Sequence, residues 1–442
     1  MTIPTEKFRR FLRHGRKNLT KSKTEMKTNS KKIIVDDVHI SRDEQSVTVQ
    51  VKFSVGEDLE QYIDSQILEN KYFAVADGGV IPKSLAVVPF VCNVLPLVWL
   101  TDAELVLDEL DNCFYESIPN IKKGYEDMYP QLCFKGHIVV KTNVVNDNFG
   151  QKSLCLFSGG VDSYATLFAH MSEKPLLLAV HGADVPLSDI AAWAIVEQGI
   201  IDTAKQFSLD YICCQSNFRT FVNEQNLNVL LSKIKCKEDW WHGFQHGIGL
   251  IGLVAPLSTV ESIKTLYIAS TFTIRERQIV TCASDPRIDN NVAFSGVDVV
   301  HDQFEYNRQE KIQKIVAFCA NKGVHIKLHV CWVKRDGNNC CDCEKCWRTI
   351  YGLIVAGGNP YDYGFYVSDN QLKRIKRKIK YILVLSNITI PLWKDIQKAY
   401  IENNIDNNNI QWIRHYDFEK WNIWKRSSRD IRRKIRHVFG ME

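Results

Sequence analysis

Hydrophobic and polar positions alternate with two different rhythms along this chain of 442 residues. Residues 33–56 alternate apolar and polar side chains with a period of two, which predicts a pair of strands, and residues 133–145 predict another strand. Between them, the strongly apolar stretch 84–100 predicts a buried core segment, and residues 102–123 predict a helix. We therefore expect a separate N-terminal α+β accessory domain over residues 33–150.

From about residue 151 short apolar strands alternate with longer amphipathic helices. This order is typical of a parallel sheet with helices on both faces, so the predicted fold class of this core is α/β. The predicted strands cover residues 154–157, 176–180, 211–214, 266–270 and 324–332. The predicted helices cover residues 164–172, 189–207, 244–257 and 308–321. The expected organisation is a tail (1–32), the accessory domain (33–150), the α/β core (151–330), a cysteine-rich segment (331–360) and a C-terminal region (361–442).

The two ends of the chain are strongly basic. Residues 1–32 carry 11 Lys or Arg against two acidic residues, and residues 371–442 carry 17 against seven, whereas the whole chain has a net charge of +5. Such ends favour an anionic partner or serve as solvated segments, and the polar tail 1–32 is expected to be disordered. In the C-terminal region tryptophans alternate with basic clusters, a pattern that can bind nucleic acid. We favour packing of a basic helical region onto the body, so nucleic acid is not the favoured partner. These tryptophans are Trp393, Trp412, Trp421 and Trp424.

Hydropathy and cysteine usage bear on the compartment. No run approaches 18 apolar residues, so we expect no membrane span. The basic N-terminus lacks an apolar leader, so we do not expect export. Fourteen cysteines in such a chain argue for a reducing, cytoplasmic location rather than a disulfide framework.

A Ser-Gly-Gly-Val-Asp-Ser motif stands between a predicted strand and a predicted helix. Two glycines let the backbone turn sharply and present N–H groups to an anion, and the following helix adds its positive end. The hydroxyls of the two serines can donate to phosphate, while the aspartate can cap the helix or hold a metal ion. No lysine follows the glycines, so this is not a Walker A loop. The predicted phosphate site therefore consists of Ser158, Gly159, Gly160, Val161, Asp162 and Ser163.

This motif resembles the signature of PP-loop ATP pyrophosphatases. The resemblance implies binding of ATP with Mg²⁺, adenylation of a carboxyl or carbonyl oxygen with release of pyrophosphate, and displacement of AMP by a nucleophile. Asp162 and Ser163 would then take part in catalysis. His181, which follows the second core strand, is a further candidate for ATP binding, although a structural role for it is about as well supported.

Five of the cysteines lie within residues 331–346. Four of them have the spacing C-x8-C-x2-C-x2-C, which suits a closed tetrahedral Zn²⁺ site of structural type. The adjacent pair Cys340 and Cys341 leaves open which of the two binds. A redox pair or unrelated core cysteines are the weaker alternatives. The predicted zinc ligands are Cys331, Cys340, Cys343 and Cys346.

The motif and the cysteines together resemble the 7-cyano-7-deazaguanine synthase (QueC) family over roughly residues 152–350. This resemblance implies adenylation of 7-carboxy-7-deazaguanine. About 150 residues precede the motif and about 90 follow the cysteines, and the segment 281–287 does not match the family's substrate-contacting segment. Long members of this kind resemble proteins of bacterial anti-phage operons (type IV CBASS and Qat), for which the implied reaction joins the activated carboxylate to a protein amine. The N-terminal domain would then be one place for a protein partner to bind.

Three alternatives remain open: nitrile synthesis with ammonia, RNA thiolation, and a non-catalytic nucleotide-binding role. Further candidates for substrate contacts lie outside the motif. His242 and His246 share a helical face beside an aromatic pair, Trp240 and Trp241. The others lie in a polar loop or begin a helix: Asp285, Arg287, Asp289, Arg308 and Lys311. A GxGxxG match at Gly247, Gly249 and Gly252 lies within a predicted helix, so we expect helix packing there and not a dinucleotide site.

Overall fold

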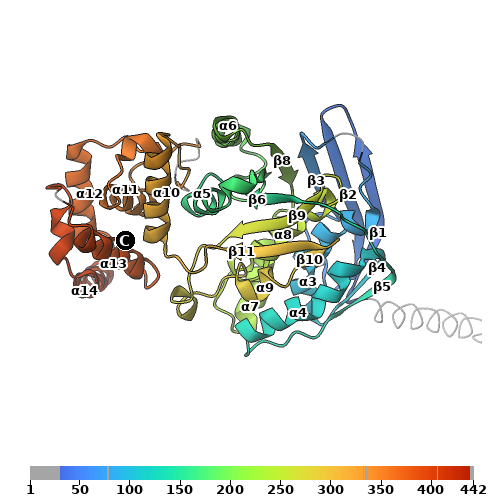
Figure 1. The fold of residues 1–442 in the computed structure, drawn as a ribbon. Helices are drawn as coiled ribbons and strands as arrows, with labels where there is room; N and C mark the ends of the chain where they lie inside the picture. Colours follow the sequence, from blue (N-terminus) through green and yellow to red (C-terminus); the bar gives the residue numbers. More distant parts are fainter. Residues whose placement is uncertain (1–29, 77–78, 332, 334–336, 406, 439–442) are drawn as a thin grey trace, which may run out of the picture.

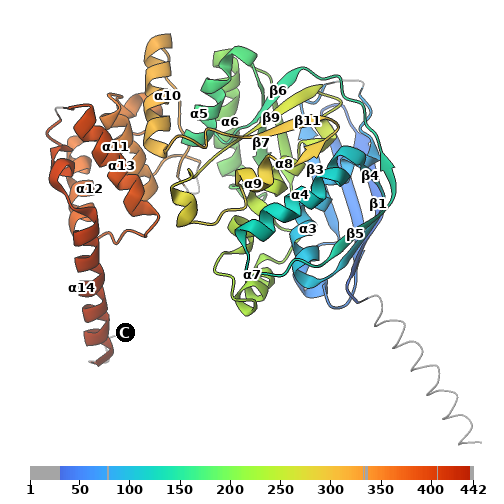
Figure 2. The same ribbon diagram turned by 60° about the horizontal axis from the view of Figure 1, so that its bottom comes forward.

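A single sheet of 11 strands runs through the described part of the protein (Figures 1 and 2). The computed structural model describes residues 30–76, 79–331, 333, 337–405 and 407–438, without the side chains of 278 and 429–438. The strand order is β10-β11-β9-β6-β7-β8-β3-β2-β1-β4-β5. The strands are β1 (Lys32–Arg42), β2 (Ser46–Val55), β3 (Ile67–Phe73), β4 (Glu104–Asp111), β5 (His137–Val144), β6 (Lys152–Leu156), β7 (Leu176–His181), β8 (Tyr211–Ser216), β9 (Ile263–Ala269), β10 (Ala293–Phe294) and β11 (Val297–Asp302).

The sheet has a parallel half and a mixed half. Strands β11, β9, β6, β7 and β8 are parallel neighbours, as the alternation of strands and helices predicts. β3 pairs antiparallel with β8 and continues into the antiparallel strands β2 and β1, which are followed by the parallel strands β4 and β5. The expected separate domain over residues 33–150 therefore differs from the structure, because the ladder between β3 and β8 makes one continuous sheet.

Alternate residues of the central strands enter two different cores. Leu154 and Leu156 of β6 belong to one apolar cluster, whereas Cys155 belongs to the other. A strand directs successive side chains to opposite faces, so an almost wholly apolar strand such as β6 must be covered on both sides. The helices of the first cluster include α3 (Val88–Thr101), α4 (Asn112–Met128) and α8 (His246–Gly252). Those of the second include α5 (Val161–Ala169), α6 (Ile190–Phe207) and α10 (Arg308–Lys322).

The helix predicted over residues 102–123 is wrong in its first half. α3 ends at Asp102, whose φ of 55° turns the chain, and β4 follows. Leu105 and Leu107 are buried alternately along this strand, so a period of two overrides the helical interpretation. α4 begins only at Asp111, whose side chain accepts a hydrogen bond from the Phe114 N–H as an N-cap.

The predicted strand over residues 324–332 is also wrong within the described residues. This segment has no regular secondary structure and is held instead by hydrogen bonds to two loops. The Leu328 N–H donates to the Tyr363 carbonyl at 3.2 Å, and the His329 N–H donates to the Gly159 carbonyl at 2.8 Å. The apolar residues of the segment therefore pack without joining the sheet, and they bring the cysteines beside the Ser-Gly-Gly loop.

The GxGxxG match lies in α8 and packs closely, as predicted. An added Cβ at Gly247 would stand 2.2 Å from Asp289 Oδ1, and one at Gly252 would stand 2.8 Å from Cys92 Cβ of α3. The glycines let helices approach each other, and they do not form a dinucleotide loop.

Replacing Gly247 by alanine is therefore expected to lower the free energy of unfolding by roughly 1–3 kcal/mol, because the added methyl group overpacks the contact with Asp289. Gly199 of α6 is the matched control, since nothing lies within 4 Å of an added Cβ there. Gly199→Ala should stabilise the protein by about 0.4–1 kcal/mol. Urea unfolding of both variants measures the difference, and equal midpoints would contradict the packing role.

The C-terminal region is helical and basic, as predicted. It comprises α11 (Glu344–Val355), α12 (Asp369–Tyr381), α13 (Thr389–Glu402) and α14 (Phe418–Val438). Trp393 is fully buried and Trp412 is partly buried, which confirms packing for these two residues. Trp421 and Trp424 remain 41% and 52% exposed, so the packing prediction is wrong for them. The tail 1–29, predicted to be disordered, lies outside the described residues.

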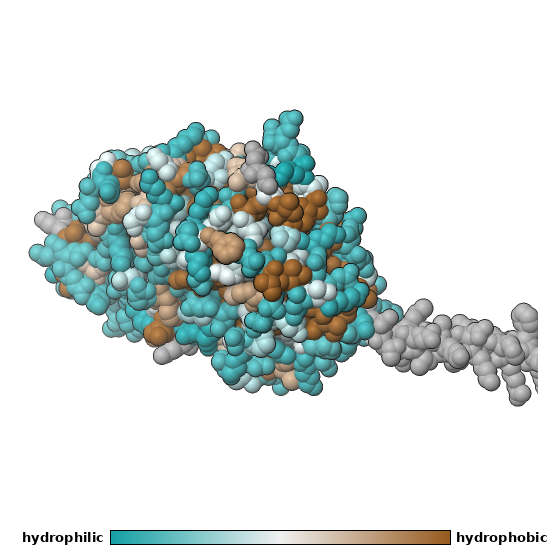
Figure 3. Space-filling model, turned by 45° about the vertical axis from the view of Figure 1, so that its right-hand side comes forward, coloured by the Kyte–Doolittle hydropathy of each residue, from teal (hydrophilic) through white to brown (hydrophobic). Residues whose placement is uncertain are grey.

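Exposed apolar side chains are scattered over the surface. On the face shown in Figure 3, hydrophobic residues gather in several patches separated by hydrophilic ones. Within the part of the chain that the structure describes, every helix is too short or too polar to cross a bilayer.

Candidate functional site

The Ser-Gly-Gly loop connects β6 to α5 at the carboxyl end of the parallel strands. Gly159 has a φ of +71°, a conformation that favours glycine, and Gly160 is the N-cap of α5. The Ser163 hydroxyl donates to the Gly160 carbonyl at 3.1 Å and lies 3.4 Å from Ser158 Oγ. Both hydroxyls therefore lie beside the N-terminus of α5, where backbone N–H groups and the helix dipole favour an anion.

Asp162 faces cationic side chains from α10. Its Oδ2 lies 3.1 Å from Arg308 Nη1, and its Oδ1 lies 3.6 Å from Lys311 Nζ. Burial alone would raise the pKa of Asp162, but the charges of Arg308 and Lys311 outweigh burial and lower it. Lys311 is itself buried and donates to the carbonyl and hydroxyl of Ser270 at 2.6 and 2.9 Å. The loop is thus bordered by two fixed cations.

Two more cations reach this region from α11. Lys345 and Arg348 interact electrostatically with both Asp162 and Arg308. Burial lowers the pKa of Lys345 to about 7, assisted by repulsion from Arg308, and burial also lowers the pKa of Arg348 below its usual range. Arg348 is held by Glu344, with 3.2 Å between Arg348 Nε and Glu344 Oε1. Arg308 and Lys311 contact the loop carboxylate, and Lys345 and Arg348 lie within electrostatic range of it, an arrangement that favours a multivalent anion.

Lys345 and Arg348 were not predicted from the sequence. They lie on either side of Cys346, and their i, i+3 spacing at the start of α11 places them on one helix face. That spacing is the only sequence signal for their role. Arg308 and Lys311, by contrast, were candidates, and the structure brings both of them to Asp162.

The four predicted cysteines form a compact cluster. The sulfur atoms of Cys331, Cys340, Cys343 and Cys346 all lie within 4.8 Å of one another. Four sulfurs at about 2.3 Å from a tetrahedral zinc ion would lie about 3.8 Å apart. The observed separations of 4.0 Å between Cys331 and Cys343 and of 3.9 Å between Cys340 and Cys346 match this value. The cluster could therefore hold a metal ion such as zinc.

The structure also distinguishes the two adjacent cysteines. Cys340 belongs to the cluster, whereas the Cys341 thiol lies 3.8 Å from the Asn339 carbonyl. Cys343 is at the same time the N-cap of α11, and its sulfur accepts from the Cys346 N–H at 3.5 Å. The cysteine cluster thus fixes the first turn of the helix that carries Lys345 and Arg348.

His181 lies at the end of β7 and is buried. Its Nε2 lies 3.1 Å from the Pro186 carbonyl, and its ring stacks on Trp193 with 4.6 Å between centroids. Burial lowers the pKa of His181 and so favours the neutral ring. These contacts organise the loop after β7, and ATP binding by His181 stays a prediction. A side chain at Gly182 would collide with the Ser216 carbonyl, 2.0 Å from an added Cβ.

A second group of residues lies beyond the loop at the same end of the sheet. A π-helical turn, Trp241–Gln245, precedes α8, and such turns are frequent at functional sites. The Arg219 guanidinium lies over the Trp241 ring at 4.1 Å, and the His246 ring meets Trp241 edge-on at 4.8 Å. Asp184 interacts electrostatically with both His246 and Lys345, which links this aromatic group to the cationic loop. Arg219 and Asp184 were not predicted.

The polar loop candidates are largely paired with one another. Asp285 binds Arg277, with 2.8 Å between Arg277 Nε and Asp285 Oδ2, and also binds Arg287 at 2.9 Å. Asp289 is fully buried and lies 2.7 Å from His301 Nδ1. Trp240 is buried in the core, and His242 lies 3.9 Å from Glu238. The carboxylate of Asp285 is thus paired with arginines, whereas Asp289 Oδ1 and Trp240 Nε1 have no hydrogen-bond partner among the described residues.

The contacts of His170, at the end of α5, should make the free energy of unfolding depend on pH. Its ring lies 3.0 Å from Glu173 Oε1 and 3.1 Å from Asp302 Oδ1. Burial lowers its pKa, but the bonds to Asp302 and Glu173 outweigh this and leave the pKa raised above 6.5. The stabilisation is therefore present below pH 6.5 and is lost as the pH rises through the raised value. Between pH 6 and 8, the free energy of unfolding should fall by up to about 1 kcal/mol more in the wild type than in His170→Gln. Denaturant titrations at both pH values test this, and parallel profiles would contradict it.

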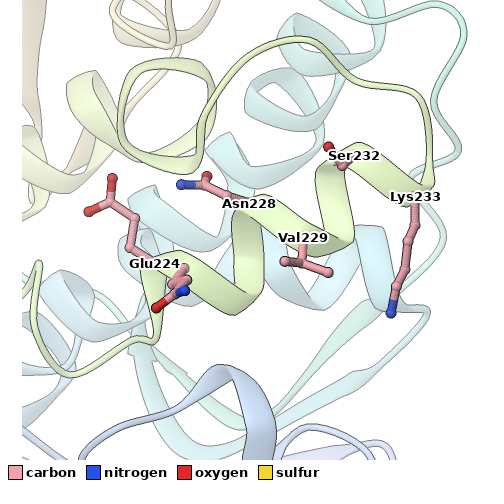
Figure 4. Close-up of a pocket in the computed structure, with 6 residues that line it drawn as sticks. Glu224, Asn228, Val229, Ser232 and Lys233 are labelled. Atoms are coloured by element: carbon pink, nitrogen blue, oxygen red, sulfur yellow. The ribbon is translucent and has the colours of Figure 1, made fainter. Parts of the chain in front are cut away.

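A shallow pocket follows one face of α7 (Glu224–Lys233), as Figure 4 shows. α7 lies away from α5 and α10 in both ribbon views, so this pocket is not part of the candidate site. Comparisons with protein-family models, curated proteins and solved structures found no match to this chain.

Proposed function

We propose that this protein is an ATP-dependent ligase that adenylates a carboxylate and transfers the acyl group to an amine, releasing pyrophosphate and AMP. The observation that carries this proposal is the convergence of Arg308, Lys311, Lys345 and Arg348 on the Ser158–Ser163 loop. A triphosphate is the common cellular anion whose charge matches several clustered cations and whose cleavage such cations assist. The setting is proposed to be the reducing cytoplasm.

Each group of the site has a distinct task in this reaction. The Gly159 turn and the α5 N-terminus would hold phosphate oxygens, and the Ser158 and Ser163 hydroxyls would donate to them. Lys311 and Arg308 would neutralise the charge that develops on the departing pyrophosphate. Asp162 would hold Mg²⁺, which when bound shields the phosphates from one another. Catalysis would rest on positioning and charge neutralisation rather than on a covalent enzyme intermediate.

The cysteine cluster fits a structural Zn²⁺ ion. Its four sulfurs leave no open position for a substrate, so the metal would supply stability and geometry to α11. Its contribution to the reaction is therefore indirect. It would fix the helix that carries Lys345 and Arg348.

The proposed substrate is the carboxylate of a 7-deazaguanine, and this part rests on the resemblance to the 7-cyano-7-deazaguanine synthase family. The aromatic group beside the loop supports a planar ligand. Trp241 presents a ring already covered by a guanidinium on one side, and His246 Nδ1 is a buried polar atom without a hydrogen-bond partner among the described residues. Asp184, which interacts electrostatically with both His246 and Lys345, is the group that relates this aromatic site to the cationic loop. The proposed acceptor is a protein amine, with ammonia as the alternative.

RNA thiolation is less well supported by the site. That reaction needs a cysteine that ionises readily near the nucleotide. Burial raises the pKa of several core cysteines outside the four-cysteine cluster and so favours their protonated thiols. These include Cys92, Cys155, Cys213, Cys214 and Cys282.

The experiment that tests the proposal is mass spectrometry of the zinc-replete protein incubated with ATP, Mg²⁺ and 7-carboxy-7-deazaguanine. Ammonia and candidate acceptor proteins are offered separately. AMP together with an amide of a protein supports the proposed acceptor, whereas an amide or nitrile of the free base supports ammonia. If AMP forms only with other carboxylates, the 7-deazaguanine substrate is wrong. If no AMP forms with any acceptor, the ligase assignment is refuted.

A further inference from the structure

The outer side of α12 is densely basic. Six of its 13 residues are lysine or arginine, and its apolar residues Leu372, Ile375 and Ile379 face the core. Within the described part of the chain, Arg374 and Lys378 pair with Asp342 of the cysteine segment, but no carboxylate pairs with Lys373 or Arg377. The exposed charge of α12 is therefore only partly neutralised by the protein itself.

An aromatic row adjoins the end of this helix. Lys380 Nζ lies 5.9 Å from the centre of the Tyr416 ring, and the Tyr416 ring is parallel to Trp421 at 6.5 Å. Trp421 in turn meets Trp424 at 5.9 Å, and the i, i+3 spacing places both on one face of α14. These contacts place Lys380 beside the aromatic row, and Arg377 and Lys373 follow on the same side of α12, one and two turns earlier.

Internal packing does not account for Trp421 and Trp424. Trp393 and Trp412 fill the helical core, whereas Trp421 and Trp424 are about half exposed. Two large rings on the surface leave apolar area in contact with water, and a ligand that covered them would bury it. The exposed residues of α12 before Tyr381 are polar or charged, but Tyr381, Ile382 and Ile423 are exposed apolar residues, so an anionic bilayer is the alternative that the test must separate. Flat rings beside unpaired cations suit a ligand that has both planar groups and regular negative charges.

We propose that this basic–aromatic surface, formed by Lys373, Arg377, Lys380, Trp421 and Trp424, binds single-stranded nucleic acid. The lysines and Arg377 contact successive phosphates, and the two tryptophans stack on unpaired bases. Such stacking tolerates any sequence, since every base presents an aromatic face. The surface lies on the C-terminal helices, at the opposite end of the molecule from β4 and β5 (Figures 1 and 2).

Fluorescence anisotropy of the full chain with labelled 20-mers of oligo(dT) and oligo(U) tests the proposal. Binding should weaken as salt rises, and tryptophan emission should be quenched on saturation. Trp421→Ala with Trp424→Ala should weaken binding by about tenfold or more, because two stacking platforms are lost. Lys373→Gln with Arg377→Gln should lower the slope of log affinity against log salt by about 1.4, roughly 0.7 for each phosphate contact.

Because residues 1–32 are also basic, the variants decide where the nucleic acid binds. The matched control is Lys123→Gln with Lys141→Gln, which removes two exposed charges from α4 and β5. It should leave binding unchanged, and pyrophosphate exchange should stay normal in every variant. Binding to phosphatidylserine vesicles is measured in parallel. The proposal is overturned if the wild type binds neither oligonucleotide, or if the tryptophan pair and the Lys373/Arg377 pair both bind the oligonucleotides as the wild type does. It is also overturned if these variants lose binding to the vesicles but keep binding to the oligonucleotides.

Discussion

Asp162→Asn is expected to lower ATP-dependent pyrophosphate exchange by at least about 100-fold, the usual cost of losing one group that acts on charge at a reacting centre. The carboxylate is the loop's only acidic group, and its Oδ1 has no hydrogen-bond donor among the described residues. In the absence of ligand it also neutralises Arg308 and Lys311. The neutral amide binds Mg²⁺ more weakly than a carboxylate and cannot balance these two cations.

The same substitution should destabilise the protein when no ligand is bound. Leaving buried cations without their counter-ion costs up to about 3 kcal/mol. Added pyrophosphate should then raise the melting temperature of Asp162→Asn more than that of the wild type, because the anion replaces the lost charge. Differential scanning fluorimetry measures this difference, and Asp298→Asn, which alters an exposed ion pair with Lys264, is the control. Normal exchange activity in Asp162→Asn would refute the proposed function of the loop.

Cys343→Ser is expected to abolish metal binding by the cysteine cluster and to weaken the proposed ATP binding by at least about 100-fold. Cys343 is both a member of the cysteine cluster and the N-cap of α11. Without it the first turn of α11 loses its anchor, and Lys345 and Arg348 lose their fixed positions. Each charge-assisted hydrogen bond to phosphate is worth about 1.5–3 kcal/mol, so two of them account for the predicted loss.

Cys341→Ser is the matched control for this prediction. Cys341 is the immediate neighbour of Cys340, but its thiol faces the Asn339 carbonyl and not the cluster. This variant should keep one zinc ion per chain by elemental analysis and bind ATP as the wild type does. Loss of zinc in Cys341→Ser, or its retention in Cys343→Ser, would show that the ligand set is wrong.

Local patterns predicted most of the strands and helices of the core. The buried strand at 154–157 and the amphipathic helices at 189–207 and 308–321 were correct because a period of two or of 3.6 survives in their apolar residues. The cysteine spacing likewise placed four sulfurs together. In each case the residues that form the pattern lie close together in the sequence.

Several of the errors involve contacts between distant segments. The pairing of β3 with β8 joins residues about 140 positions apart, and alternation within β3 does not indicate which strand lies beside it. Lys345 and Arg348 lie within electrostatic range of a loop about 185 residues earlier, and their i, i+3 spacing alone does not distinguish them from solvent-facing cations. The segment 324–332 is apolar enough for a strand, yet its backbone hydrogen bonds go to two loops.

The ladder between β3 and β8 limits how this protein can be dissected. Asn70 and Phe73 pair with Ser216 and Cys213 in the middle of the sheet, where β8 has no other neighbour on that side. A chain cut to begin at residue 150 would leave β8 as a bare apolar edge, which invites pairing with a second molecule and aggregation. Separately expressed halves should therefore be soluble only when produced together. The first 150 residues are therefore part of the same sheet as the Ser-Gly-Gly loop and not an optional attachment.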